Sequence, residues 1–196
     1  AYSEDRTIGR NAIRQHLANL KNAGSLYGRI IYNKAPIMMR QLENILGKEA
    51  FKEGIQEYIK TYANGNADWN ELVSILDKKT SKNIKKWSEV WVNSSGRPII
   101  TDKIDYVDGK ISSFTIQQAA EDGSDKLWTQ SFKMGFVYEN EVKVLDVVIS
   151  DKEFVLNEAV GLDKPTQLIY NYDGFGYGIF PIEKKESYDF LALEDD

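Results

Sequence analysis

The hydrophobic pattern of this chain changes once, near Pro98, and this change most constrains the fold. Before Pro98 the apolar residues recur at the three- and four-residue spacing of amphipathic helices. After it they alternate or form short β-branched and aromatic runs. We therefore expect an α+β chain, with a helical part at residues 1–97 and a β-rich part at residues 98–190. The acidic end, residues 191–196, is interpreted as the truncated start of a next element.

The helical part is expected to contain five short helices. The first ends at Gly24, and the second begins around Asn33, because Pro36 is tolerated only in a first turn, and ends at Gly47. The fourth is capped by Asp68, with Glu71 three residues later as in a capping box. The apolar residues assigned to these helices are Ile13, Leu17 and Leu20 in the first; Ile37, Met38, Leu42, Ile45 and Leu46 in the second; Phe51, Ile55, Ile59 and Tyr62 in the third; Leu72, Val73 and Leu76 in the fourth; and Ile84, Trp87 and Trp91, after a cap at Ser81, in the fifth.

The second part is expected to be antiparallel. Asp108-Gly109 predicts a tight hairpin because both central positions favour positive φ, and Glu139-Asn140 predicts a second hairpin. About seven strands at turn spacings of roughly 8–12 residues favour a β-sandwich. The expected strands are 99–107, 110–118, 127–138, 141–149, 153–156, 166–172 and 176–182.

Composition excludes several kinds of partner and site. The net charge of -5 argues against nucleic acid as a ligand, and no apolar run approaches the roughly 20 residues that a membrane span needs. Because the chain has no cysteine, it has no disulfides, and its compartment cannot be inferred from redox chemistry. It has one histidine, His16, whereas a catalytic zinc site usually takes three protein ligands with histidine prominent among them. The sequence therefore predicts no complete hydrolytic zinc centre within this chain, and no bound cofactor.

Several segments, in order, carry a resemblance to a known family. They are the segment from Tyr32 to Glu43, Leu46-Gly-Lys-Glu-Ala-Phe51 with Tyr58 after it, Trp69 with Leu72, Trp87 to Trp91 with Gly96 and Pro98, and Asn171-Tyr-Asp-Gly-Phe-Gly-Tyr177. Each alone is weak, but together they cover most of residues 25–182. In this order and spacing the chain resembles zinc metallopeptidases of the aminopeptidase N type. It departs from the family pattern at Ala35-Pro36, where Gly-Ala is common.

The resemblance implies a fold, an activity and a site. Residues 1–97 would be the C-terminal helical part of a thermolysin-like catalytic domain, and residues 98–190 the β-sandwich that follows as a spacer. In that family zinc is held by a His-Glu-x-x-His helix and a later glutamate, neither of which is found here. The chain would then be a fragment of a zinc aminopeptidase that hydrolyses N-terminal peptide bonds, lacking the N-terminal and C-terminal domains and inactive alone. Zinc and the peptide substrate would bind to the full-length protein.

Tyr32 is the one catalytic residue that the resemblance assigns. A phenol donates a hydrogen bond at neutral pH and can stabilise the negative oxygen of a tetrahedral intermediate. The alternative is a core tyrosine with a satisfied hydroxyl. At the level of the whole chain, the alternative is a non-catalytic binding or scaffolding module whose sandwich recognises a carbohydrate or a protein, and a non-proteolytic family member also stays open.

Other residues have both a functional and a structural interpretation. His16, without a partner at i+4, is expected to be a surface or core residue rather than a ligand. The basic run at Lys78, Lys79, Lys82, Lys85 and Lys86 is expected to be a solvated helix face rather than an anion site. Met38-Met39 is expected to fill the core rather than line a substrate pocket. The cluster Tyr170, Tyr172, Phe175, Tyr177 and Phe180 is expected to pack in the sandwich core and turns rather than form a sugar-stacking platform.

Overall fold

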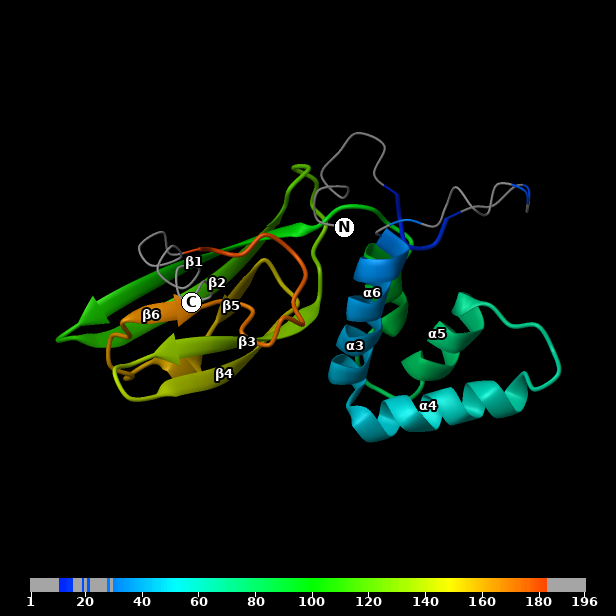
Figure 1. Cartoon of the computed structure of the whole chain (residues 1–196), viewed down its shortest axis with the longest axis horizontal. Helices are drawn as coiled ribbons and strands as arrows, with labels where there is room; N and C mark the ends of the chain where they lie inside the picture. Colours follow the sequence, from blue (N-terminus) through cyan, green and yellow to red (C-terminus); the bar gives the residue numbers. More distant parts are fainter. Residues whose placement is uncertain (1–10, 16–18, 20, 22–27, 29, 183–196) are drawn as a thin grey trace, which may run out of the picture.

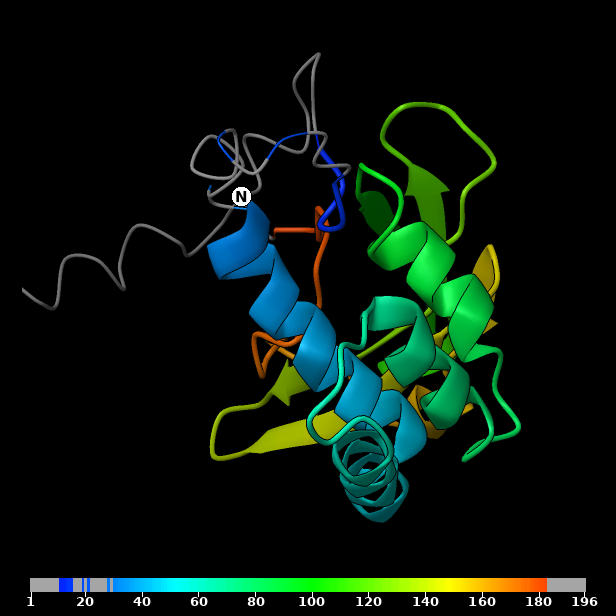
Figure 2. The same ribbon diagram turned by 90° about the vertical axis from the view of Figure 1, so that its right-hand side faces the viewer.

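The computed structural model of the protein describes residues 11–15, 19, 21, 28 and 30–182. A helical part and a β part lie side by side, as expected for an α+β chain (Figure 1). The helical elements are the π-helical turn η2 (Ile30–Lys34) and the helices α3 (Ala35–Leu46), α4 (Lys48–Thr61), α5 (Trp69–Asp77) and α6 (Ile84–Trp91). Figure 2 shows α4 nearly end-on beneath the other three helices. Within the described ranges, no helix has the length and apolar character needed to cross a membrane.

The last four predicted helices are confirmed as elements. Gly47 ends α3 at a positive φ of 86°, with its N–H donating to the carbonyl of Glu43. Asp68 and Glu71 form the predicted capping box of α5. The first predicted helix falls largely on residues outside the described part; of its span, residues 11–15, 19 and 21 are described, and none of them belongs to an α-helix.

The predicted cap of α6 at Ser81 is wrong by two residues. Asn83 is the cap, and its Oδ1 accepts a hydrogen bond of 2.7 Å from the N–H of Lys86. The carboxylate of Asp77 accepts from the N–H groups of Ile84 and Lys85, which are also free at a helix start. Asn83 and Asp77, the last residue of α5, therefore supply the acceptors for the first turn of α6.

The β part consists of two three-stranded antiparallel sheets. One has the order β1 (Pro98–Val107), β2 (Lys110–Ala120), β5 (Glu153–Val155), and the other β4 (Val142–Ile149), β3 (Gln130–Val137), β6 (Gln167–Ile169). A short 3-10 helix, η3 (Asn157–Ala159), follows β5. The hairpin between β1 and β2 has positive φ at both Asp108 (51°) and Gly109 (74°), as predicted. The two sheets enclose a core of large apolar side chains that includes Ile100, Phe114, Phe132, Phe136 and Val147, so the predicted sandwich is confirmed.

The predicted strand at residues 176–182 is wrong. Only Ile179 makes an isolated bridge, to Ile99, with Ile100 N–H donating to Ile179 O and Ile179 N–H donating to Pro98 O. Gly178 has a φ of 156° and lies so close to Pro98 that an added Cβ would be 2.8 Å from the Pro98 carbonyl oxygen. The segment runs close along the start of β1 instead of pairing along its length.

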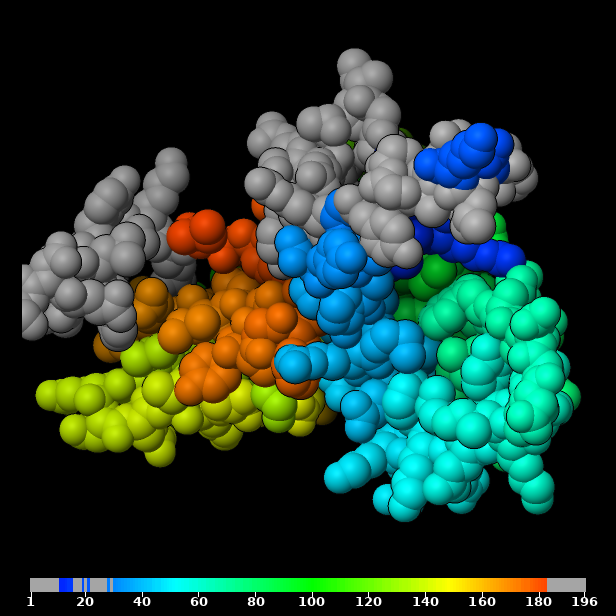
Figure 3. Space-filling view, turned by 45° about the vertical axis from the view of Figure 1, so that its right-hand side comes forward, coloured from blue at the N-terminus to red at the C-terminus, as the bar shows by residue number. Residues whose placement is uncertain are grey.

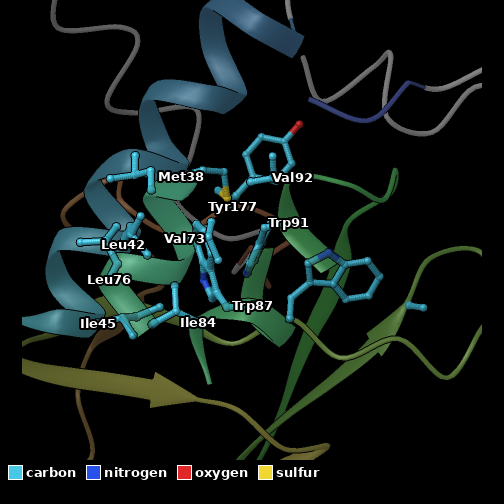
Figure 4. Packing of buried hydrophobic residues seen from close by; sticks show 13 residues of the cluster. Met38, Leu42, Ile45, Val73, Leu76, Ile84, Trp87, Trp91, Val92 and Tyr177 are labelled. Atoms are coloured by element: carbon cyan, nitrogen blue, oxygen red, sulfur yellow. The ribbon is translucent and has the colours of Figure 1, made fainter. Parts of the chain in front are cut away.

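The core of the helical part extends into the sandwich. It contains side chains from α3, α5 and α6, and it also includes Ala120, Trp128 and Tyr177 from the β part. Figure 4 shows Tyr177 and Trp91 close to Met38 and Leu42 of α3. In Figure 3 the orange segment near the end of the described chain lies against the blue helix α3. The two parts therefore share a continuous apolar core.

Candidate functional site

Tyr32 lies at the centre of the π-helical turn η2, immediately before α3. Its side chain is 65% exposed, whereas Ile30 and Lys34 at the two ends of the turn are buried. The N–H groups of Ile31 and Tyr32 both donate to the carbonyl of Gly28, at 3.1 and 3.2 Å. π-Helical turns are rare and are found frequently at functional sites. The structure thus places the tyrosine on the surface of the helical part, at the start of a helix, rather than in the core.

Pro36 accounts for the widened turn. A proline has no N–H, and its ring clashes with the carbonyl four residues earlier, which here belongs to Tyr32. A regular α-helical turn from residue 32 is therefore disfavoured, and Pro36 is accommodated in the first turn of α3. The departure from the family pattern at Ala35-Pro36 lies where the backbone changes from the π to the α form.

Lys34 is completely buried at the junction of the two parts. Its Nζ donates a 3.0 Å hydrogen bond to the carbonyl of Gly96 and lies 5.0 Å from the ring centre of Tyr177 and 5.9 Å from that of Trp91. Cations bind the faces of aromatic rings at such distances. The sequence pattern alone assigns no role to Lys34, because lysine is almost always a surface residue. The only signal was its place two residues after Tyr32 in the matched segment.

The segment around Gly96 joins Lys34 to the first strand of the sandwich. Gly96 has a φ of 104°, which a residue with a side chain rarely adopts, and this conformation directs its carbonyl toward Lys34. Arg97 is buried beside it and donates to both carboxylate oxygens of Glu121, at 2.7 and 3.1 Å. Pro98 then begins β1. The Gly-x-Pro pattern therefore forms the connection between the helical part and the sandwich.

The segment Asn171–Tyr177 is a compact loop that carries Tyr177 into the shared core. Asn171 has a φ of 54°, and its side-chain amide bonds both the N–H and the carbonyl of Gly176. A Cβ at Gly176 would lie 2.7 Å from Phe180, so the loop requires glycine there. Tyr177 is fully buried, and its N–H donates to the side-chain oxygen of Gln130 at 2.9 Å. The loop is thus a structural device that fixes Tyr177 against Lys34 and Trp91.

The aromatic residues near the end of the chain do not form one stacking surface. Tyr177 is buried at the junction, Phe180 packs edge-on against Phe132 in the sandwich core, and Tyr172 covers Gly135. Phe175 lies under the guanidinium of Arg40 at 5.1 Å. The interpretation of these residues as core and turn packing is favoured over a sugar-binding platform.

The basic run is divided between ion pairs and one cleft. Lys79 pairs with Glu57 at 2.7 Å, and Lys85 lies 3.6 Å from Asp77. Mutual attraction lowers the pKa of Glu57 and raises that of Lys79, with their hydrogen bond as the largest cause. Lys82 and Lys86 line a cleft of about 330 Å³ between α6 and the sandwich. Most of the run therefore lies on a solvated, partly paired face, as expected.

No described residues form a metal site. Across the described ranges, no group of three or more His, Cys, Asp or Glu side chains is arranged to hold a metal ion. His16 lies outside the described residues. Met38 is 2% exposed and belongs to the shared core, which confirms its predicted core-filling role.

Comparison with known proteins identifies the chain's relatives. Residues 1–91 match the Peptidase family M1 domain. Aminopeptidase N of Streptomyces lividans is 31% identical over 121 residues, which cover 61% of this chain and 14% of that protein. The tricorn protease-interacting factor F2 of Thermoplasma volcanium is 25% identical over 180 residues, covering 87% of this chain and 22% of that protein.

The fold has a counterpart among solved structures. The crystal structure of Legionella pneumophila aminopeptidase A in complex with aspartic acid superimposes with a TM-score of 0.60 and 18% identity, covering 88% of this chain and 20% of that one. The matched regions thus make up 14% to 22% of the length of these relatives. The match of residues 1–91, the relatives and the fold agree with the ordered motifs from Tyr32 to Tyr177, and together they show that this chain is similar to members of peptidase family M1.

Proposed function

We propose that this chain is part of a zinc-dependent aminopeptidase that hydrolyses N-terminal peptide bonds, and that Tyr32 stabilises the transition state. The observation that carries the proposal is the exposed phenol of Tyr32 on a π-helical turn whose two ends are buried. This turn lies within the residues that match the M1 domain, and relatives of the chain are named as aminopeptidases. A surface tyrosine at a rigid helix start suits a role in binding a substrate better than a role in the core.

The phenol would act by electrostatic stabilisation. When water attacks a peptide carbonyl, negative charge develops on the carbonyl oxygen, and a preorganised donor aimed at that oxygen is worth roughly 2.7–4 kcal/mol. The Tyr32 O–H would donate to this oxygen. Because Tyr32 lies between two buried residues of one short turn, its hydroxyl would need little reorganisation as the charge develops.

Peptidases of this family depend on zinc in general. The described residues do not provide a set of ligands that would hold zinc. We propose that the ligands, and the groups that hold the substrate's amino terminus, belong to further N-terminal and C-terminal domains of a longer protein. In that arrangement residues 1–97 are the end of a thermolysin-like domain, residues 98–190 the sandwich that follows, and residues 191–196 the start of another element.

Replacing Tyr32 with phenylalanine in the longer protein tests the proposal. Tyr32→Phe should lower kcat about 10²–10³-fold, with KM changed little, because the lost hydrogen bond forms only in the transition state. Steady-state kinetics on an aminoacyl amide substrate measure both constants. Tyr172→Phe is the matched control, since Tyr172 is also exposed but covers Gly135 in the sandwich. An unchanged kcat in Tyr32→Phe would remove the role, and metal-dependent peptidase activity from the 196 residues alone would contradict the divided site.

A further inference from the structure

Lys34 is fully buried, and the proposed function gives this lysine no role. Lysine is almost never fully buried unless its ammonium group is paired, because removing the charge from water is costly. Here the whole side chain is inaccessible, and its Nζ is held by the Gly96 carbonyl and faces two aromatic rings. These contacts offset the lost hydration and fix the end of the side chain at one place.

The geometry of the turn connects this buried group to Tyr32. In a helical turn, residues i and i+4 point to similar sides, and residue i+2 points to the opposite side. Ile30 and Lys34 are such a pair, and both are buried, while Tyr32 between them is exposed. Holding Lys34 inward therefore holds Tyr32 outward. The N–H groups of Ile31 and Tyr32 bond the Gly28 carbonyl on the N-terminal side of the turn, and Lys34 holds its C-terminal side.

The restraint on Lys34 comes from segments distant in the sequence. Gly96 is 62 residues away, and Trp91 and Tyr177 come from α6 and from the loop after β6. Tyr177 is itself rigid: its ring packs edge-on against Trp91 at 6.1 Å, and its N–H bonds Gln130 of β3. Tyr177 and Lys34 thus form one connection from the sandwich to the turn that carries Tyr32.

We infer that Lys34 is a positioning residue for Tyr32, and that the β-sandwich takes part in the active site by holding Lys34 through Tyr177. This inference rests on the proposed function of Tyr32. The ammonium group of Lys34 does not touch substrate. It keeps the π-helical turn in the form that presents the Tyr32 hydroxyl, and the sandwich is in this respect a component of the site rather than a spacer.

Lys34→Met in the longer protein tests the inference, because methionine keeps the length of the side chain and removes the charge and the hydrogen bond. At a temperature where the variant is fully folded, kcat should fall at least tenfold and KM should change less than twofold. Hydrogen exchange at the Tyr32 amide, which bonds Gly28, should become at least tenfold faster. Lys52→Met, an exposed lysine on α4, is the matched control and should change neither quantity.

A double-mutant cycle separates positioning from a general loss of structure. If Lys34 acts through Tyr32, Lys34→Met should lower kcat strongly in the native background and less than twofold in the Tyr32→Phe background. A loss of the same size in both backgrounds would overturn the positioning role while leaving the proposed function intact. If Tyr32→Phe alone left kcat unchanged, the proposed function would fail first, and unaltered exchange at Tyr32 in Lys34→Met would show separately that Lys34 does not hold the turn.

A variant on the sandwich side tests the second half of the inference. Tyr177→Leu removes the ring under the ammonium group and should lower kcat at least fivefold with KM nearly constant. Tyr106→Leu, a change of the same kind at an exposed position near the far end of β1, should leave kcat unchanged. If Tyr177→Leu and Tyr106→Leu had the same kcat, the sandwich would have no part in positioning Tyr32.

Discussion

Gln41 lies in the middle of α3, and its side chain is completely buried against the sandwich. Its Nε2 donates to the carbonyls of Ser131 and Phe175, both at 2.5 Å, and its Oε1 accepts from the N–H of Ser131 at 2.7 Å. One side-chain amide therefore bonds backbone groups of a strand and of a loop, which are 90 and 134 residues away in sequence. A buried amide with all three contacts fixes the rotation of α3 about its axis, and hence the direction in which its first turn points.

Replacement of Gln41 should destabilise the protein through these lost contacts. Gln41→Met conserves the volume but leaves the partly buried Ser131 N–H and two carbonyls without this partner, at a cost of about 2 kcal/mol. Urea denaturation followed by circular dichroism measures the free energy of unfolding. Gln56→Met, at an exposed position on α4, is the control and should be within about 0.5 kcal/mol of the native protein. Equal free energies of unfolding for the two variants would show that the Gln41 contacts do not stabilise the protein.

The start of α6 is an element whose position the sequence suggests only approximately. Ser81 and Asn83 are both residue types that cap helices, and both precede the apolar run of α6. Asn83 is the cap because Asp77, at the end of α5, accepts hydrogen bonds from the N–H groups of Ile84 and Lys85. These bonds fix where the helix begins. The preceding helix thus selects between two equivalent local signals.

The two candidate caps give a direct comparison. Asn83→Ala should lower the free energy of unfolding by about 1 kcal/mol, because the N–H of Lys86 loses its acceptor. Ser81→Ala should have little effect, since Ser81 is exposed and two residues before the cap. Thermal denaturation of both variants under the same conditions checks this order. The reverse order would place the cap at Ser81, as the sequence pattern alone predicts.

At the scale of the whole molecule, the helices and the sandwich are joined by a shared core rather than by a linker. Trp91 of α6 packs edge-on against Trp128, at 6.2 Å, and against Tyr177, and its indole N–H donates to the carbonyl of Thr129. Met38 and Leu42 of α3 belong to the same cluster. A core of this kind couples the stability of the two parts, because neither can unfold without exposing the aromatic residues at the junction.

The shared core predicts a single unfolding transition. Hydrogen exchange in increasing urea should report the same midpoint for peptides from α5 and from β2, which lie in different parts of the chain. Tyr177→Ala should shift both midpoints together, because it opens a cavity in the common cluster. Two separate midpoints in the native protein, or a shift limited to the sandwich, would show that the parts are independent domains.

The spacing of the apolar residues and the residue types at turns were sufficient to predict most of the local structure. The α5 capping box, the end of α3 at Gly47 and the Asp108-Gly109 hairpin all depend on residues close in sequence, and all are present. The strand expected at residues 176–182 is absent because its alternation has a different cause: Tyr177 and Ile179 are needed by contacts with Trp91 and Pro98. Residues 176–182 are a loop that crosses the junction, with Gly176 and Tyr177 buried and Ile182 exposed.

For the candidate site, the ordered motifs were enough to indicate the family resemblance, since it depends on which residues occur and at what spacing, and the catalytic role of Tyr32 stays a prediction. The burial of Lys34, the aromatic contacts around it and the π-helical turn were decided by the tertiary structure. Each depends on a partner far along the chain: Gly96 at 62 residues for Lys34, and Phe175 at 134 residues for Gln41. Local sequence determines how a segment folds on itself, but burial of a charged or polar side chain depends on which distant groups meet it, and only the packed molecule brings those groups together.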